Sequence, residues 1–244
     1  MKTFRTAIEL REDSRKRMRD EVVSETPLSI SVNGQHLATA MVTPEKRKEF
    51  IVGHLFSEGI IDSLDKIKLM EINEKEAKVI ADIREFVGGR TILSGCGSAS
   101  NLMSKLPRIK SGLKIKRKVM MDAVSDVLRS GSSKRTGGYH RCAAFSASGK
   151  LFSAEDVGRH NALDKVIGAM LLKKCNFSRT FVVSTGRISS DMVLKCSRAN
   201  IPIVASKGAT TSLAVDIAKK TGLTIVGFVR GGRMNVYCGA GRVI

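Results

Sequence analysis

Alternating apolar and polar residues predict a small sheet with one helix near the start of the chain. Two alternating runs within residues 28–42 flank Asn33-Gly34, a dipeptide that favours the tight turn of a β-hairpin. Thr43-Pro44 then supplies a helix N-cap and a proline at the first helical position, which predicts a helix to about Ser57. A second strand pair is expected at residues 66–72 and 77–83, so residues 20–85 are predicted to form a ββαββ unit.

The second half of the chain alternates short runs of β-branched apolar residues with helical patterns. This arrangement is typical of a largely parallel sheet that helices cover on both faces. The expected strands are 139–146, 150–154, 180–184, 202–206, 223–230 and 234–238. The expected helices are 121–128, one that opens at Asp156 or just after it, and two that begin near residues 189 and 210.

A glycine-rich and basic segment separates the two patterns. Residues 86–118 have a loop-like composition, and no acidic residue occurs from Gly97 to Met121, so we expect a basic arm and a domain boundary here. The predicted organisation is a small α+β domain at residues 1–90, a cysteine-bearing basic loop at 91–119, and a larger α/β domain at 120–244.

The composition of the chain argues against a disordered, a membrane-spanning or a secreted protein. With 42% hydrophobic residues the chain can bury a core, which excludes wholesale disorder. It has no apolar run of about 18 residues and opens on charged residues rather than on a signal peptide, so neither a membrane span nor secretion is expected. The five cysteines include no CxxC pair, which is typical of the reducing cytoplasm.

The net charge of +19 favours polyanionic ligands, which include nucleic acid, anionic membranes and phosphate-bearing molecules. Nucleic acid is the weaker candidate because aromatic residues make up only 5% of the chain and tryptophan is absent. No zinc-finger spacing or RNA-binding aromatic motif occurs either.

Three of the predicted strands end in loops whose residues suit phosphate binding. Glycines let backbone amides approach an anion, and arginine or lysine neutralises it. Ligands of open α/β sheets bind at the carboxyl ends of the strands. Tight turns explain one such loop equally well, whereas three at one edge favour phosphate binding. The loops are Ser184-Thr185-Gly186-Arg187, Ser206-Lys207-Gly208 and Arg230-Gly231-Gly232-Arg233.

Cys96 is a candidate nucleophile. It lies between Gly95 and Gly97, just before the basic segment, and nearby cations lower the pKa of a thiol and favour the reactive thiolate. The alternative is a buried, inert cysteine. Cys142, Cys175 and Cys196 fall on strand or helix patterns and are expected in the core.

A third cluster combines His140, Glu155, Asp156 and His160. These side chains could form an acid–base pair or a metal site, although their spacing matches no zinc signature. In the alternative interpretation, Asp156 caps a helix and His160 is a buried hydrogen-bonding residue.

Four motifs together resemble the formate dehydrogenase accessory proteins of the FdhD/NarQ family. The most specific is the string from Glu155 to Gly168, EDVGRHNALDKVIG. The resemblance extends from about Pro27 to Tyr237. The other three motifs are Gly137–His140, Ser184–Arg187 and Gly227–Arg233.

The resemblance implies a sulfur carrier. In this family a cysteine desulfurase loads a persulfide on a loop cysteine, which matches Cys96. The sulfur then passes to the bis-molybdopterin guanine dinucleotide cofactor, which carries molybdenum or tungsten, before the cofactor enters the catalytic subunit of formate dehydrogenase. The segment that binds the guanine nucleotides of the cofactor matches Phe228, Val229, Arg230, Gly231, Gly232 and Arg233.

The resemblance also implies the fold and the oligomeric state. The second domain is expected to have the mixed, mostly parallel sheet of the cytidine deaminases without their zinc, and the chain is expected to form a homodimer. No resident metal and no membrane partner are expected.

One position departs from the family pattern. Many members carry a CxxC pair in the cysteine loop, whereas this chain has Ala99 at the second position. A dithiol relay within the loop is therefore excluded. A single persulfide remains chemically sufficient, because attack on its outer sulfur needs no resolving thiol. Two functions stay open: a sulfur carrier, or a chaperone that delivers the cofactor without sulfuration.

Overall fold

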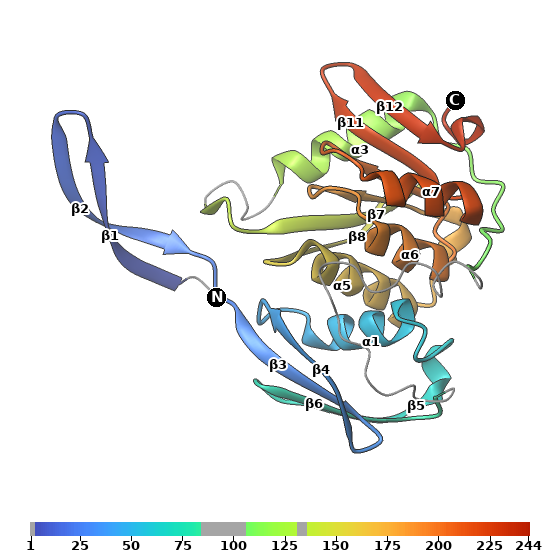
Figure 1. Cartoon of the computed structure of the whole chain (residues 1–244), viewed down its shortest axis with the longest axis horizontal. Helices are drawn as coiled ribbons and strands as arrows, with labels where there is room; N and C mark the ends of the chain where they lie inside the picture. The colour runs from blue at the N-terminus through green and yellow to red at the C-terminus, as the bar shows by residue number, and fades with distance from the viewer. Residues whose placement is uncertain (1–2, 84–105, 131–135) are drawn as a thin grey trace.

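The computed structural model describes residues 3–83, 106–130 and 136–244, and these ranges contain three sheets (Figure 1). A two-stranded hairpin projects from the molecule. A four-stranded sheet packs on one helix, and a six-stranded sheet carries the remaining α-helices. No helix in these ranges is long and apolar enough to cross a membrane.

The four-stranded sheet has the predicted ββαββ order. Leu28, Ile30 and Val32 alternate with polar residues and are buried against the helix of this unit. The strand order is β4-β3-β6-β5, with β3 and β6 parallel at the centre. The elements are β3 (Thr26–Val32), β4 (Gln35–Val42), α1 (Arg47–Ser57), β5 (Ile67–Ile72) and β6 (Glu76–Ala81).

The start of α1 differs from the prediction. The helix begins at Arg47, after Lys46 in a left-handed conformation, and Thr43 does not cap it. Thr43 is buried instead, and its hydroxyl donates to the Asp156 carboxylate at 3.0 Å. A long-range contact therefore occupies the side chain that the local pattern assigns to the helix end.

The six-stranded sheet has the order β12-β11-β10-β9-β7-β8. Its strands are β7 (His140–Ser146), β8 (Gly149–Asp156), β9 (Phe181–Ser184), β10 (Ile203–Ser206), β11 (Thr224–Arg230) and β12 (Arg233–Cys238). Its helices are α3 (Arg117–Arg129), α5 (Arg159–Leu172), α6 (Ser190–Arg198) and α7 (Ser212–Thr221).

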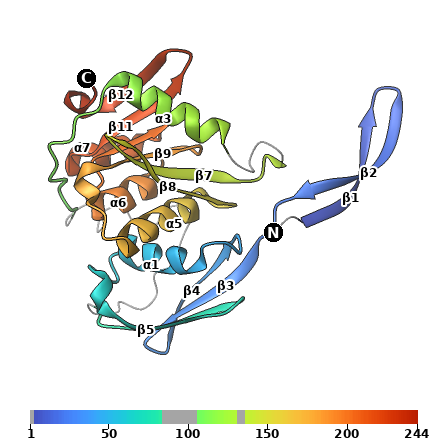
Figure 2. The ribbon, with the colours of Figure 1, turned by 180° about the vertical axis from the view of Figure 1, so that it is seen from behind.

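The large sheet is mixed. Only the pairs β9–β10 and β10–β11 are parallel, so the expectation of a mostly parallel sheet is wrong for three of the five neighbouring pairs. Tight turns join β7 to β8 and β11 to β12, and such turns connect only antiparallel strands, which accounts for two of the three pairs. The third pair, β7–β9, is antiparallel because β9 runs in the same direction as β8. The predicted covering of both faces is confirmed: α5, α6 and α7 cover one face and α3 covers the other (Figures 1 and 2).

Residues 106–116, which belong to the predicted basic segment, lie along the body of the large sheet. The backbone N–H of Ile109 donates to the carbonyl of Thr221 at 2.8 Å, and Ile115 is buried and pairs with Val243. The apolar side chains of this stretch pack against the core of the large unit, while its lysines and its arginine are exposed. The remainder of the predicted loop, at 91–105, lies outside the described residues.

Helices α1 and α5 cross at two glycines and thereby join the two larger sheets. A Cβ atom on Gly53 would lie 1.8 Å from the carbonyl oxygen of Asp164, and one on Gly168 would lie 1.9 Å from that of Glu49. The two backbones are thus in direct contact, and only hydrogen fits at either position.

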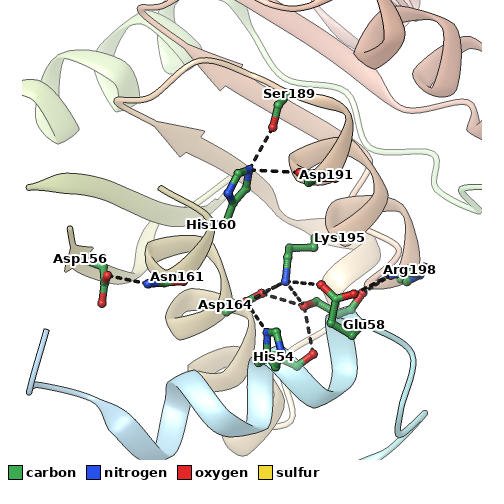
Figure 3. Close-up of polar contacts among 11 residues, drawn as sticks. His54, Glu58, Asp156, His160, Asn161, Asp164, Ser189, Asp191, Lys195 and Arg198 are labelled. Carbon is green, nitrogen blue, oxygen red and sulfur yellow. Dashed lines mark hydrogen bonds and ion pairs between the residues drawn. The ribbon is translucent and has the colours of Figure 1, made fainter. Parts of the chain in front are cut away.

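A buried ionic network surrounds this crossing (Figure 3). The Asp164 carboxylate of α5 accepts hydrogen bonds from Lys195 of α6 at 2.7 and 2.9 Å and from Ser57 of α1 at 2.7 Å. His54 of α1 also contacts it, at 3.1 Å. Although burial opposes ionisation, Lys195 and His54 lower the pKa of Asp164 to about 2. The carboxylate therefore stays charged and needs partners from both units.

A second buried ion pair lies at the other end of α1. Lys165 of α5 is fully buried and contacts the Asp156 carboxylate at 2.6 Å. Lys165 also donates to the carbonyl of Thr43, which leads from β4 toward α1. Each charged lysine thus has ligands from both the small and the large unit.

The close contact of α1 and α5 at Gly53 predicts that a single added methyl group there strongly destabilises the protein. Gly53→Ala is expected to lower the free energy of unfolding by about 3 kcal/mol, because α1 and α5 must separate to admit it. Gly112→Ala is the matched control, since nothing lies within 4 Å of its added Cβ and its φ is not positive; a change below about 0.5 kcal/mol is expected. Urea denaturation measures both. Equal stability of the two variants would contradict the close contact.

A candidate anion site at one edge of the large sheet

The ends of β9, β10 and β11 meet at one edge of the large sheet, as the sequence predicts. The three strands are adjacent and parallel, so the loops that follow them lie side by side. The loops after β9 and β10 have the same type of turn. Gly186 N–H donates to the Ser184 hydroxyl at 3.2 Å, and Gly208 N–H donates to the Ser206 hydroxyl at 2.9 Å. Ser206 in turn donates to the carbonyl of Gly186 at 2.7 Å, which ties the loops together.

Two arginines and a histidine lie at the first of these loops. A Cβ on Gly186 would lie 3.0 Å from the Cβ of Arg159 and 3.3 Å from Nδ1 of His140, so this glycine makes room for both side chains. Arg159 opens α5, His140 opens β7, and Arg187 follows Gly186 in the loop. Residues far apart in the sequence thus converge at the edge.

Arg187 acts on Arg159, and both arginines act on His140, as like charges that Asp191 and Asp156 oppose in part. Burial, and then the guanidinium groups of Arg159 and Arg187, lower the pKa of His140. Burial, and then Arg187, lower the pKa of Arg159, although Asp191 acts in the opposite direction. The Nε atom of Arg159 is buried and has no hydrogen-bond partner among the described residues. An anion bound here would reduce the repulsion between the two arginines and would accept a hydrogen bond from Nε of Arg159.

The predicted cofactor segment lies at the end of β11 and the turn into β12. Phe228 has a left-handed backbone, with φ of 51°, at a break in the β11–β12 register. This conformation is strained for a bulky residue. Its N–H donates to the carbonyl of Gly208 at 3.1 Å, so the segment is joined to the β10 loop.

The side chains of this segment differ in their exposure. The Arg230 guanidinium lies 5.8 Å from the Phe228 ring centroid, a cation–π distance, and both side chains are at least partly accessible. Val229 is buried in the core, and the turn glycines Gly231 and Gly232 have positive φ. Arg233, which opens β12, is exposed.

The expected acid–base set does not assemble. The Asp156 carboxylate is fully buried and bonded to Thr43, Lys165 and Asn161, and Glu155 pairs with Arg141 at 2.6 Å. No group of three or more His, Cys, Asp and Glu side chains that could hold a metal occurs within the described ranges.

The alternative interpretation, in which Asp156 caps a helix and His160 forms a buried hydrogen bond, is correct only in part. Gly158, not Asp156, is the N-cap residue of α5, although Asp156 accepts the Gly158 N–H at 3.0 Å. His160 does form a hydrogen bond, with Ser189 at 3.0 Å (Figure 3). Burial and then Arg159 lower its pKa to about 4, so it is neutral at physiological pH.

Comparison with known proteins matches both the sequence and the fold. The family model described as "FdhD/NarQ family" matches residues 23–244. The chain belongs to the FdhD/NarQ family. "Sulfur carrier protein FdhD" of Methanothermobacter thermautotrophicus is 35% identical over 240 residues, which cover 96% of this chain and 95% of the relative. The protein of that name from Saccharolobus solfataricus is 38% identical over 235 residues, with 92% and 91% covered.

A solved structure has the same fold over the whole chain. The crystal structure of a protein proposed to be a formate dehydrogenase accessory protein, from Desulfotalea psychrophila, superimposes with a TM-score of 0.85 at 29% identity. The match covers 100% of this chain and 99% of that one.

Within this FdhD/NarQ chain, Cys96 lies outside the described residues. Cys142 and Cys196 are fully buried, and burial raises the pKa of Cys142 far above its usual range and that of Cys196 to about 12. Burial also raises the pKa of the half-buried Cys238. Cys175 is half-buried beyond the end of α5 that is remote from the anion site.

Arg159 is the residue of the site that sequence reasoning missed. It belongs to the family string EDVGRHNALDKVIG, but nothing in the local pattern shows that the start of α5 meets the loop after β9. A signal was present: a helix that follows an outer strand of an α/β sheet opens at the same edge as the neighbouring parallel strand ends.

The cation cluster predicts a coupled titration. Arg187→Gln is expected to raise the pKa of His140, since it removes a positive charge that opposes protonation of the imidazole. Lys207→Gln removes the same charge from the neighbouring loop and is expected to change this pKa less. NMR titration of the His140 ring protons measures both. An unchanged His140 pKa in the Arg187 variant would show that the two groups are not coupled.

Proposed function

We propose that this chain is a sulfur carrier for formate dehydrogenase that takes up sulfur as a persulfide on Cys96. It passes the sulfur to bis-molybdopterin guanine dinucleotide, with molybdenum or tungsten, which it binds as a substrate at the anion site. The names of the relatives support the carrier role. The proposed sulfur donor is a cysteine desulfurase, and the proposed receiver of the cofactor is the catalytic subunit of formate dehydrogenase.

The observation that carries the proposal is the cation cluster at the ends of the strands. Arg159 and His140 both lie against Gly186, which precedes Arg187, although, in addition to the effect of burial, Arg187 lowers the pKa of both and Arg159 lowers that of His140. Such an arrangement is unfavourable in the empty protein and becomes favourable when an anion binds. The guanine nucleotides of the proposed substrate bring several phosphates to one place.

The roles of the residues follow from their positions. Arg159 and Arg187 would neutralise phosphate, and Gly186 and Gly208 would let backbone N–H groups approach it. Phe228 and Arg230 present flat groups on which a guanine can stack, Arg233 adds a charge, and the turn Gly231-Gly232 leaves space beside them. Val229 fixes the segment in the core.

The chemistry at Cys96 is a thiol exchange. Its thiolate attacks the outer sulfur of the donor's persulfide, a new S–S bond forms at Cys96, and the donor's own thiolate leaves. The step needs no added oxidant or reductant. Cys142, Cys196 and Cys238 are poor alternatives because burial keeps them protonated, and Cys175 sits at the far edge of the sheet.

Sulfur loading is tested by the mass of the intact protein after incubation with a cysteine desulfurase and cysteine. The wild type is expected to gain one sulfur that dithiothreitol removes, and Cys96→Ala is expected to gain none. Cys175→Ala is the matched control and should load like the wild type. A gain in Cys96→Ala would move the carrier role to another cysteine.

Nucleotide binding is tested with guanosine diphosphate as the probe. Arg230→Gln is expected to weaken binding by about tenfold, the usual effect of losing one charge-assisted contact. Lys173→Gln, at the opposite end of α5, removes the same charge away from the site and should leave the affinity unchanged. Isothermal titration calorimetry gives both values. Equal affinities would place the nucleotide elsewhere.

The second candidate function is a chaperone that binds and delivers the cofactor without sulfuration. The observation in its favour is Ala99, where many members of the family have a second cysteine. It predicts that Cys96→Ala still supports maturation of formate dehydrogenase. Loss of maturation in this variant, with guanosine diphosphate binding intact, decides for the sulfur carrier.

A further inference from the structure

The hairpin of β1 (Thr3–Arg11) and β2 (Ser14–Val22) stands apart from both larger sheets (Figures 1 and 2). It forms a separate two-stranded sheet, and the family model begins only after it, at residue 23. An isolated two-stranded hairpin is at best marginally stable in water. The hairpin would therefore gain stability if another molecule covered one of its faces.

One face of the hairpin combines exposed apolar side chains with arginines. The strand register places Phe4, Ile8 and Leu10 of β1 on the same face as Arg15, Arg17 and Arg19 of β2. Thr6 and Glu21 lie on this face as well, with Glu21 across from Phe4. The three apolar residues are 42%, 51% and 72% exposed. The Arg19 guanidinium lies 5.4 Å from the Phe4 ring centroid. We call this face the apolar–arginine face.

The opposite face has different chemistry. Arg5 stands across from Asp20, and Lys16 stands across from Glu9, so its positive charges have acidic neighbours. Ala7 and Met18, which pair between them, are less exposed than the apolar residues of the first face. The apolar–arginine face is thus the side that combines the larger exposed apolar surface with three arginines and a single carboxylate, that of Glu21.

The base of the hairpin is fixed beside the anion site. A Cβ on Gly138 would lie 2.4 Å from a methyl group of Val23, and the backbone of Ser24 is hydrogen-bonded to the phenol of Tyr139. These residues directly precede His140 at the start of β7. A molecule on the hairpin would therefore lie next to the edge where the strand ends meet.

We infer that the apolar–arginine face is a docking surface for a client protein that presents carboxylates beside apolar side chains. Charge complementarity points to this occupant, because the arginines need acidic partners and the apolar row needs to be buried. A nucleic acid fits less well, since the tip of the hairpin carries Glu12-Asp13 and the apolar row would stay uncovered. A second copy fits this face less well because the same face of another chain would present arginines to these arginines.

The test uses the full-length chain and, as the probe, the purified catalytic subunit of formate dehydrogenase; only this choice of probe rests on the proposed function. Arg15→Gln/Arg17→Gln is expected to weaken binding by about tenfold. Arg5→Gln/Lys16→Gln removes the same charge from the opposite face and should change the affinity by less than about twofold. Ile8→Ser/Leu10→Ser should weaken binding as the arginine pair does. Raising the salt concentration should weaken the wild type more than Arg15→Gln/Arg17→Gln.

The outcomes separate this inference from the proposed function. Sulfur loading of Cys96 and binding of guanosine diphosphate are measured on the same variants and are expected to match the wild type, as is the melting temperature of the body. Equal effects of the two charge pairs, or no binding by the wild type, would overturn the inference. So would a change confined to self-association in sedimentation, or to affinity for a random-sequence DNA duplex.

Discussion

The contact between α1 and α5 is the constraint on which the arrangement of the two larger sheets depends. Gly53 and Gly168 let the helix backbones touch, and this contact brings Asp164 and Lys195 together with Ser57 and His54. A buried charge that loses one partner destabilises a protein by about 3–5 kcal/mol. Because the ligands of each buried lysine come from both units, removal of either unit would leave a buried charge without some of its partners. The small sheet is therefore a part of the main fold rather than an independent module.

The same constraint supports the anion site at the other end of α5. The middle of this helix is fixed by α1 and α6, and Asp156 holds its first turn by accepting bonds from Gly158 and Asn161. Arg159 is thereby kept beside Arg187 although the two repel each other. Electrostatic strain of this kind persists only where the surrounding structure fixes the groups in place. The packing of the core and the position of Arg159 at this edge are therefore connected through one helix.

The sequence predicted the elements better than it predicted their long-range partners. Alternation in residues 28–42 and the apolar runs at β9, β10 and β11 reflect the periodicity of buried faces, which is a local property. Thr43 was misassigned because its partner, Asp156, lies 113 positions away. The hairpin β1–β2 was missed although Phe4, Ile8 and Leu10 alternate, since its turn at Glu12-Asp13 lacks glycine or asparagine and most of its other residues are charged. Arg159 required knowledge of which strand ends share an edge.

Three departures from local rules lie on one side of the molecule, although left-handed residues also occur at Lys174 and Asn200, away from this side. The left-handed Phe228, the cation cluster and the base of the solitary hairpin all lie where β7 begins and where β9, β10 and β11 end. At the opposite edge, residues 106–116 make ordinary backbone hydrogen bonds and bury their apolar side chains. Strain that persists in a fold is expected where function requires it. The left-handed Phe228 and the unpaired Nε of Arg159 therefore share the edge at which we propose that the cofactor binds.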